Sequence, residues 1–159
     1  MNKNKILIVT GKIKTGKTTR LMKWVSSQKN IDGILQPVVE EKRFLYHISS
    51  KTLIQLETNS TANVISIGKF NFSLLAFEKA KKIIEESLTK NLDYLVIDEI
   101  GPVELNGKGL EPIITKVISE KDLFSGKLIL VVREEIFEKF LNHYKLSKED
   151  YEIFEIKEI

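Results

Sequence analysis

The most informative stretch of the sequence runs from residue 11 to residue 18 and reads Gly-Lys-Ile-Lys-Thr-Gly-Lys-Thr. It matches the pattern G-x-x-x-x-G-K-[ST] in full. Its two glycines let the backbone curl so that successive N–H groups point toward phosphate oxygens. An apolar strand over residues 6–9 precedes it, and an amphipathic helix expected over residues 17–28 follows it. A strand, such a loop and a helix in this order indicate a nucleotide phosphate site.

The residue types in this Walker A motif suit the chemistry of a triphosphate. The expected helix N-terminus adds partial positive charge beside the loop. We expect Lys17 to bridge the β- and γ-phosphates, the Thr18 hydroxyl to bind Mg²⁺, and Thr19 to contact the α-phosphate. The predicted nucleotide-binding residues are Gly11, Lys12, Ile13, Lys14, Thr15, Gly16, Lys17, Thr18 and Thr19.

Two adjacent carboxylates, Asp98 and Glu99, follow another apolar run at residues 95–97. Mg²⁺ requires oxygen ligands beyond the triphosphate and a threonine hydroxyl. We expect Asp98 to hold the metal, directly or through a water, as in a Walker B motif. Glu99 is then placed to orient and partly deprotonate a water that attacks the γ-phosphate. The predicted metal ligands are Thr18 and Asp98, and the predicted catalytic groups include Lys17 and Glu99.

Strands and helices alternate along the rest of the chain, which predicts an α/β fold with a mostly parallel sheet covered on both faces. Residues 33–67 differ, because short β runs there are broken by proline and turn residues, and we predict strands and a small β-hairpin insertion. We predict one domain over residues 1–159. The other expected elements are a helix at 74–90 capped by Ser73, strands at 94–97, 128–132 and 151–156, helices at 110–119 and 134–144, and a loop at 101–109.

The composition excludes several classes of protein. The chain has 159 residues, which suits one domain, and it contains no cysteine. A disulfide framework, a cysteine-ligated metal site and a cysteine nucleophile are therefore excluded. No apolar run approaches the roughly 20 residues of a membrane span, and the first apolar run is too short for a signal-peptide core. We expect a cytoplasmic protein with no membrane partner.

Charge is distributed unevenly along the chain. The net charge is +3, yet residues 1–31 carry eight basic side chains and no acidic one, and the remainder has a net charge of −5. A basic segment suits nucleic acid, a membrane surface or a small molecule that carries phosphate. Several of these lysines flank the Walker A motif, which favours the small molecule. Nucleic acid is disfavoured, because it calls for a basic patch with interleaved aromatic residues elsewhere.

Four further residues are weaker candidates, and each has a purely structural alternative. Arg133 follows the strand at 128–132, where it is placed to contact the γ-phosphate or to stabilise charge in the transition state. The alternative is an exposed arginine at the start of a helix. Phe70 and Phe72 suit stacking on a base or a hydrophobic staple, and Glu104 is either an acid behind the site or a surface group.

These motifs resemble those of the THEP1-like nucleoside-triphosphatases, a family of P-loop NTPases. The resemblance rests on residues 11–19, on residues 69–78 (KFNFSLLAFE) and, most specifically, on residues 98–105 (DEIGPVEL). It implies a three-layer P-loop NTPase fold with a RecA-like core and Mg²⁺-dependent hydrolysis of ATP, GTP and other nucleoside triphosphates. By match to the motifs, it also implies that Lys17 and Thr18 bind phosphate and metal, that Asp98 binds metal and that Glu99 is the catalytic base.

Three functions remain open on the sequence. The first is nucleoside-triphosphate hydrolysis, which yields the diphosphate and phosphate. The second is a kinase acting on a nucleoside or nucleotide, but such enzymes use several arginines and this chain has three, Arg20, Arg43 and Arg133. The third is a GTP-binding helper of the molybdopterin-dinucleotide assembly type. The sequence leaves the oligomeric state and the source of any arginine finger open.

Overall fold

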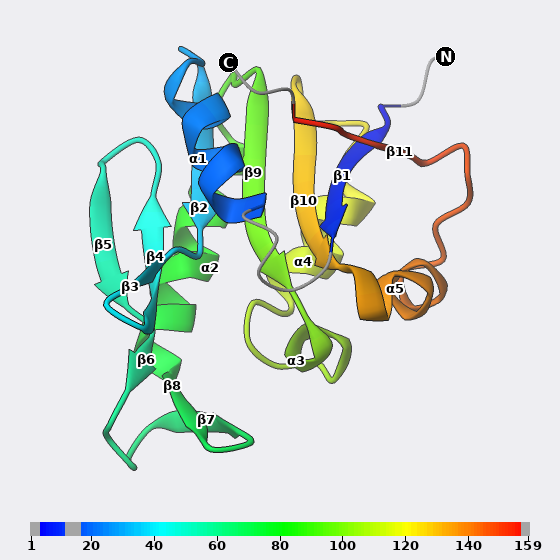
Figure 1. Cartoon of the computed structure of the whole chain (residues 1–159). Helices are drawn as coiled ribbons and strands as arrows, with labels where there is room; N and C mark the ends of the chain where they lie inside the picture. The colour runs from blue at the N-terminus through cyan, green and yellow to red at the C-terminus, as the bar shows by residue number, and fades with distance from the viewer. Residues whose placement is uncertain (1–3, 12–16, 157–159) are drawn as a thin grey trace.

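The apolar runs near residues 8, 96 and 130 form neighbouring strands of one sheet. In the computed structural model, which describes residues 4–11 and 17–156, the main sheet has the order β11-β1-β10-β9-β2-β4-β3, and β5 pairs with β4 (Figure 1). The strands are β1 (Ile6–Gly11), β2 (Ile31–Leu35), β3 (Val38–Val39), β4 (Lys42–His47), β5 (Thr52–Gln55), β6 (Glu57–Thr58), β7 (Val64–Ile67), β8 (Phe70–Ser73), β9 (Tyr94–Ile100), β10 (Lys127–Arg133) and β11 (Tyr151–Ile153).

The strands from β11 to β2 pair in parallel, which confirms the predicted mostly parallel sheet. Parallel strands end at the same edge, so the carboxyl ends of β1, β10 and β9 lie near one another. The insertion is more extensive than a single hairpin. β4 runs antiparallel to β2, β3 and β5 pair with β4, and β6, β8 and β7 form a separate antiparallel sheet.

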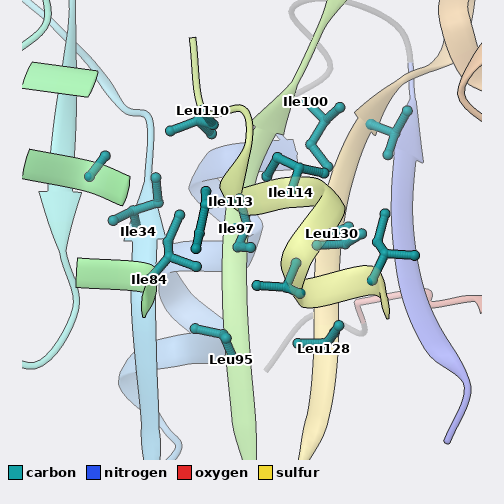
Figure 2. Packing of buried hydrophobic residues seen from close by; sticks show 14 of the residues in the cluster. Ile34, Ile84, Leu95, Ile97, Ile100, Leu110, Ile113, Ile114, Leu128 and Leu130 are labelled. Atoms are coloured by element: carbon teal, nitrogen blue, oxygen red, sulfur yellow. The ribbon is translucent and has the colours of Figure 1, made fainter. Parts of the chain in front are cut away.

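Helices cover both faces of the main sheet, as the alternating elements predict. They are α1 (Lys17–Ser26), α2 (Leu74–Leu88), α3 (Pro102–Leu105), α4 (Ile113–Ser119) and α5 (Phe137–His143), with a 3₁₀ turn η1 (Glu134–Ile136). On one face, strand residues such as Leu7 and Val131 pack against Leu21 of α1. On the other face, Ile97 and Leu130 pack against α2 and α4 (Figure 2). These are the three layers of the expected fold.

The local signals predicted the start of α2 correctly, whereas other element boundaries differ. The Ser73 hydroxyl caps α2 by accepting the backbone N–H of Ala76 at 3.1 Å. The expected helix at 110–119 begins only at Ile113, after Pro112, and the expected loop at 101–109 contains the short helix α3. Among the helices that the structure describes, none is both long enough and apolar enough to cross a bilayer.

Candidate active site

The Walker A motif lies where β1 ends and α1 begins. β1 ends at Gly11 and α1 starts at Lys17. Gly11 is the register partner of Arg133 at the end of β10. This arginine therefore lies on the strand next to β1, level with the first residue of the motif. The predicted binding residues Lys12, Ile13, Lys14, Thr15 and Gly16 lie outside the described residues, and their roles stay predictions.

The two predicted metal ligands meet in the structure. Thr18 in the first turn of α1 donates its hydroxyl to Oδ2 of Asp98 at 3.1 Å, across 80 residues of sequence. The Gln36 backbone N–H donates to the same oxygen at 3.1 Å. Asp98 is fully buried, and it lies two residues after Val96, whose side chain packs toward α1. Strand alternation therefore turns the Asp98 carboxylate to the face where Thr18 lies.

A β-bulge in β9 makes the side chains of Asp98 and Glu99 point in different directions. Val131 of β10 pairs with Asp98, but the next residue, Val132, pairs with Ile100, so Glu99 is the additional residue. The bulge shifts the strand alternation, and Ile100 packs on the α2 face. β9 thus extends through both acidic residues instead of ending before them. This local break allows the two carboxylates to take different roles.

Two arginines from different strands approach the Glu99 carboxylate, which is 8% exposed. Arg133 donates Nε–H to Oε1 at 3.0 Å, and Nη1 of Arg43 in β4 lies 3.7 Å from the same oxygen. Arg133 therefore lies beside Glu99, and its catalytic role stays a prediction. Arg43 was not singled out in the sequence as a site residue, because only the antiparallel pairing of β4 beside β2 brings it here. The sequence signal that could have pointed to Arg43 is that the chain has just three arginines.

A cavity of about 300 Å³ opens beside these charged groups. Its walls come from the inserted strands, from α2 and from the turn that contains α3. Phe72 is largely buried and belongs to the core, whereas Phe70 is 45% exposed, and both rings line the cavity. The lining residues are Gln36, Arg43, Leu56, Ile67, Phe70, Phe72, Phe77, Glu99, Gly101, Pro102, Val103, Glu104 and Arg133.

Glu104 is buried at this cavity, so it is not a surface group. Its carboxylate accepts the backbone N–H of Gly101 at 2.8 Å and that of Leu110 at 3.1 Å, which ties together the two ends of the turn. Burial raises the pKa of Glu104 to about 7, the two N–H donors oppose this shift, and the nearby Glu99 charge adds to it. Glu104 therefore fixes the turn that carries Pro102 and Val103.

A second cavity has a volume of about 380 Å³. It is formed where β1, α1 and the segment after β11 meet, and Arg20 is its basic residue. It shares no described lining residue with the 300 Å³ cavity. The residues that line the second cavity are Val9, Thr10, Arg20, Ile153, Phe154, Glu155 and Ile156.

Comparisons with known proteins agree with this geometry. A family model described as NTPase matches residues 6–159. The nucleoside-triphosphatase THEP1 of Sulfurisphaera tokodaii is 32% identical over 124 residues, with 72% of this chain and 72% of that protein covered. The crystal structure of THEP1 from the hyperthermophile Aquifex aeolicus has a TM-score of 0.72 and 15% identity, covering 94% of this chain and 88% of that chain, and it shows the shared P-loop NTPase fold. The chain belongs to the THEP1-like NTPase family.

Proposed function

We propose that this protein hydrolyses nucleoside triphosphates to the diphosphate and phosphate in an Mg²⁺-dependent reaction. The observation that carries the proposal is the 3.1 Å contact between the Thr18 hydroxyl and the Asp98 carboxylate, with Glu99 next in the chain. The name of the curated relative, a nucleoside-triphosphatase, supports the same reaction. The substrate is the nucleotide, and its base is recognised separately from its phosphates.

The phosphates are bound by the loop and the first turn of α1. In this proposal the backbone N–H groups of residues 11–16 bind phosphate oxygens, Lys17 binds the β- and γ-phosphates, and Thr19 binds the α-phosphate. The base occupies the 380 Å³ cavity beside Arg20. The contact between Thr18 and Asp98 supports this orientation of the nucleotide, because these two proposed metal ligands mark the end of the site that holds the terminal phosphate.

The residues present fit an Mg²⁺ ion. The Thr18 hydroxyl and the buried Asp98 carboxylate supply hard oxygen donors on one face of the sheet, as this ion prefers. When bound, Mg²⁺ neutralises charge on the β- and γ-phosphates. Asp98 and Thr18 are the residues that would hold it.

The catalytic step is assigned to Glu99 and its two arginines. The Glu99 carboxylate accepts a proton from the attacking water, whose oxygen bonds to the γ-phosphorus while the bond to the β-phosphate oxygen breaks. Arg133 and Arg43 hold the carboxylate in place before the reaction. They also supply positive charge beside the terminal phosphate, where it stabilises the transition state.

Phosphate release from ATP, GTP, CTP and UTP tests the proposal. The protein with Mg²⁺ and no added acceptor should release phosphate from several of these nucleotides, and Lys17→Ala should abolish release. Glu99→Gln should lower release by about 100-fold while nucleotide binding is retained, because a base is removed but the phosphate contacts stay. Glu134→Gln, at an exposed position, serves as the control. Unchanged turnover in Glu99→Gln would show that another group activates the water.

A further inference from the structure

The 300 Å³ cavity is larger and more apolar than a hydrolytic water requires. A single water occupies about 30 Å³ of liquid and needs polar partners, whereas this cavity has three phenylalanine rings in its wall. Its volume lies at the lower end of the range for small-molecule sites. The cavity therefore has room and surface for an organic ligand.

The cavity lies directly beside the proposed catalytic base. Glu99, the proposed base, is one of its lining residues. A nucleophile that Glu99 deprotonates must lie within hydrogen-bond reach of this carboxylate, so it lies in the cavity or at its floor. In the proposed function, the nucleotide base occupies the separate cavity beside Arg20. The space beside Glu99 is thus the place of the attacking molecule.

The lining suits a molecule with a flat body and a hydroxyl group. Phe70 and Ile67 are 45% and 39% exposed, so apolar surface at the cavity is left open to a ligand. The charged groups gather about the Glu99 carboxylate, where Arg43 and Arg133 lie 3.7 and 3.0 Å from one oxygen. Aromatic walls suit a planar ring, and the carboxylate suits a hydroxyl donor.

The positions of the arginines are compatible with transfer of a phosphoryl group to an acceptor other than water. The small number of arginines favoured hydrolysis in the sequence, because kinases neutralise phosphates with several of them. In the structure, two of the three, Arg43 and Arg133, converge on Glu99 from β4 and β10. The positive charge is concentrated where a phosphoryl group would pass from donor to acceptor.

We propose that the cavity lined by Glu99, Phe70 and Phe72 binds a nucleoside as phosphoryl acceptor, and that water replaces it when the cavity is empty. The step rests on the proposed function, since Glu99 is the base in both reactions. The acceptor oxygen bonds to the γ-phosphorus and the bond to the β-phosphate oxygen breaks. The hydroxyl proton passes to Glu99 and then to solvent. The products are a nucleoside monophosphate and a nucleoside diphosphate.

The test follows the fate of a labelled γ-phosphate. The full chain is incubated with Mg²⁺, γ-labelled ATP and one of thymidine, cytidine, adenosine or guanosine, and labelled nucleoside monophosphate is separated from free phosphate. At least one nucleoside should become labelled. Phe70→Ala should lower the ratio of monophosphate to free phosphate by roughly 2- to 10-fold through loss of a ring contact. This ratio is independent of the fraction of folded protein.

Leu75→Ala is the matched control, because Leu75 is 63% exposed on α2 and does not line the cavity. It should leave the ratio unchanged. Free phosphate without any labelled nucleoside would overturn the acceptor role and leave the hydrolase intact, as would nucleosides that only accelerate phosphate release. Equal ratios for both variants would place the acceptor elsewhere. If neither product forms, the proposed hydrolysis itself is wrong.

Discussion

Arg133 and Glu99, which are 34 residues apart in the chain, are joined by an Nε–H···Oε1 hydrogen bond of 3.0 Å. The arginine is the register partner of Gly11, the first residue of the phosphate motif. Arg133 therefore joins the two strands, because its backbone pairs with the end of β1 and its side chain binds the proposed base in β9. Because β10 lies between β1 and β9, one strand end serves both neighbours.

We expect Arg133→Ala to lower kcat for nucleotide hydrolysis by about 100-fold, with a smaller change in KM. The variant loses both the group that orients Glu99 and a positive charge near the transition state. Steady-state phosphate release with varied ATP gives both constants. Glu135→Ala, at an exposed position two residues on, should behave as the unaltered protein. A kcat that stays unchanged in Arg133→Ala would remove the arginine from the mechanism.

Arg43→Ala should lower kcat by a smaller factor, about 10-fold, because Nη1 lies 3.7 Å from the Glu99 oxygen and the side chain is 28% exposed. The two arginines share one carboxylate, so their effects should not add. The Arg43→Ala/Arg133→Ala double variant should fall short of the product of the two single losses. A double-mutant cycle on kcat measures this coupling, and strictly additive losses would show that the two arginines act independently.

Asp98→Asn should raise the Mg²⁺ concentration that gives half-maximal activity by roughly 10- to 100-fold. The substitution keeps the side-chain volume but replaces a charged oxygen donor near the Thr18 hydroxyl. A titration of phosphate release against Mg²⁺ at fixed ATP measures the shift. Asp93→Asn is the control, since Asp93 is exposed just before β9 begins. An unshifted titration would assign the metal to other ligands.

The stability of the protein should fall as the pH rises from about 4.5 to about 7. The pKa of Glu104 is raised from its ordinary value of 4.5 to about 7, so the folded state binds the proton more tightly than the unfolded state. The resulting stabilisation is fully present below pH 4.5 and is lost through pH 7, and it amounts to about 3 kcal/mol. Urea unfolding at several pH values should show this loss in the protein and not in Glu104→Gln. Parallel pH profiles for the two would contradict the assignment.

Gly33→Ala should destabilise the protein by about 3 kcal/mol or more. Gly33 in β2 has φ +129°, and an added Cβ would lie 2.0 Å from the carbonyl oxygen of Val96 in β9. Gly107→Ala provides the comparison, since Gly107 also has a positive φ of +77° but no described atom lies within 4 Å of the added Cβ. Thermal or urea unfolding should give a much smaller loss for Gly107→Ala, about 1 kcal/mol. Equal losses in the two variants would show that the backbone moves to relieve the contact between the added Cβ and β9.

Local sequence patterns predicted the parts of the fold that depend on local physics. The apolar runs became the central strands, Ser73 became a helix cap, and Asp98, at the carboxyl-terminal part of β9, lies near Thr18. Hydrophobic periodicity reports which side of an element is buried, and it does so without knowledge of the partner. This is why the three layers were predictable.

The remaining parts depend on contacts between distant segments. Arg43 reaches Glu99 only because β4 pairs antiparallel with β2, and nothing local in the sequence specifies that pairing. Burial of Glu104 arises from the closure of the turn between Gly101 and Leu110 around its carboxylate. A charged residue beside a turn ordinarily indicates a surface position, so the sequence left its burial open.

The inserted segment can change in sequence during evolution separately from the residues proposed to bind the phosphates and the metal. Residues 36–73 contribute Arg43, Leu56, Phe70 and other walls of the 300 Å³ cavity, whereas Thr18, Asp98 and Glu99 lie outside this segment. Substitutions within it, other than at Gln36 and Arg43, change what reaches the γ-phosphate without altering the groups that contact Asp98 and Glu99. Relatives with the same phosphate chemistry can therefore evolve different selectivities, and exchange of this segment between them is a direct route to transplanting selectivity.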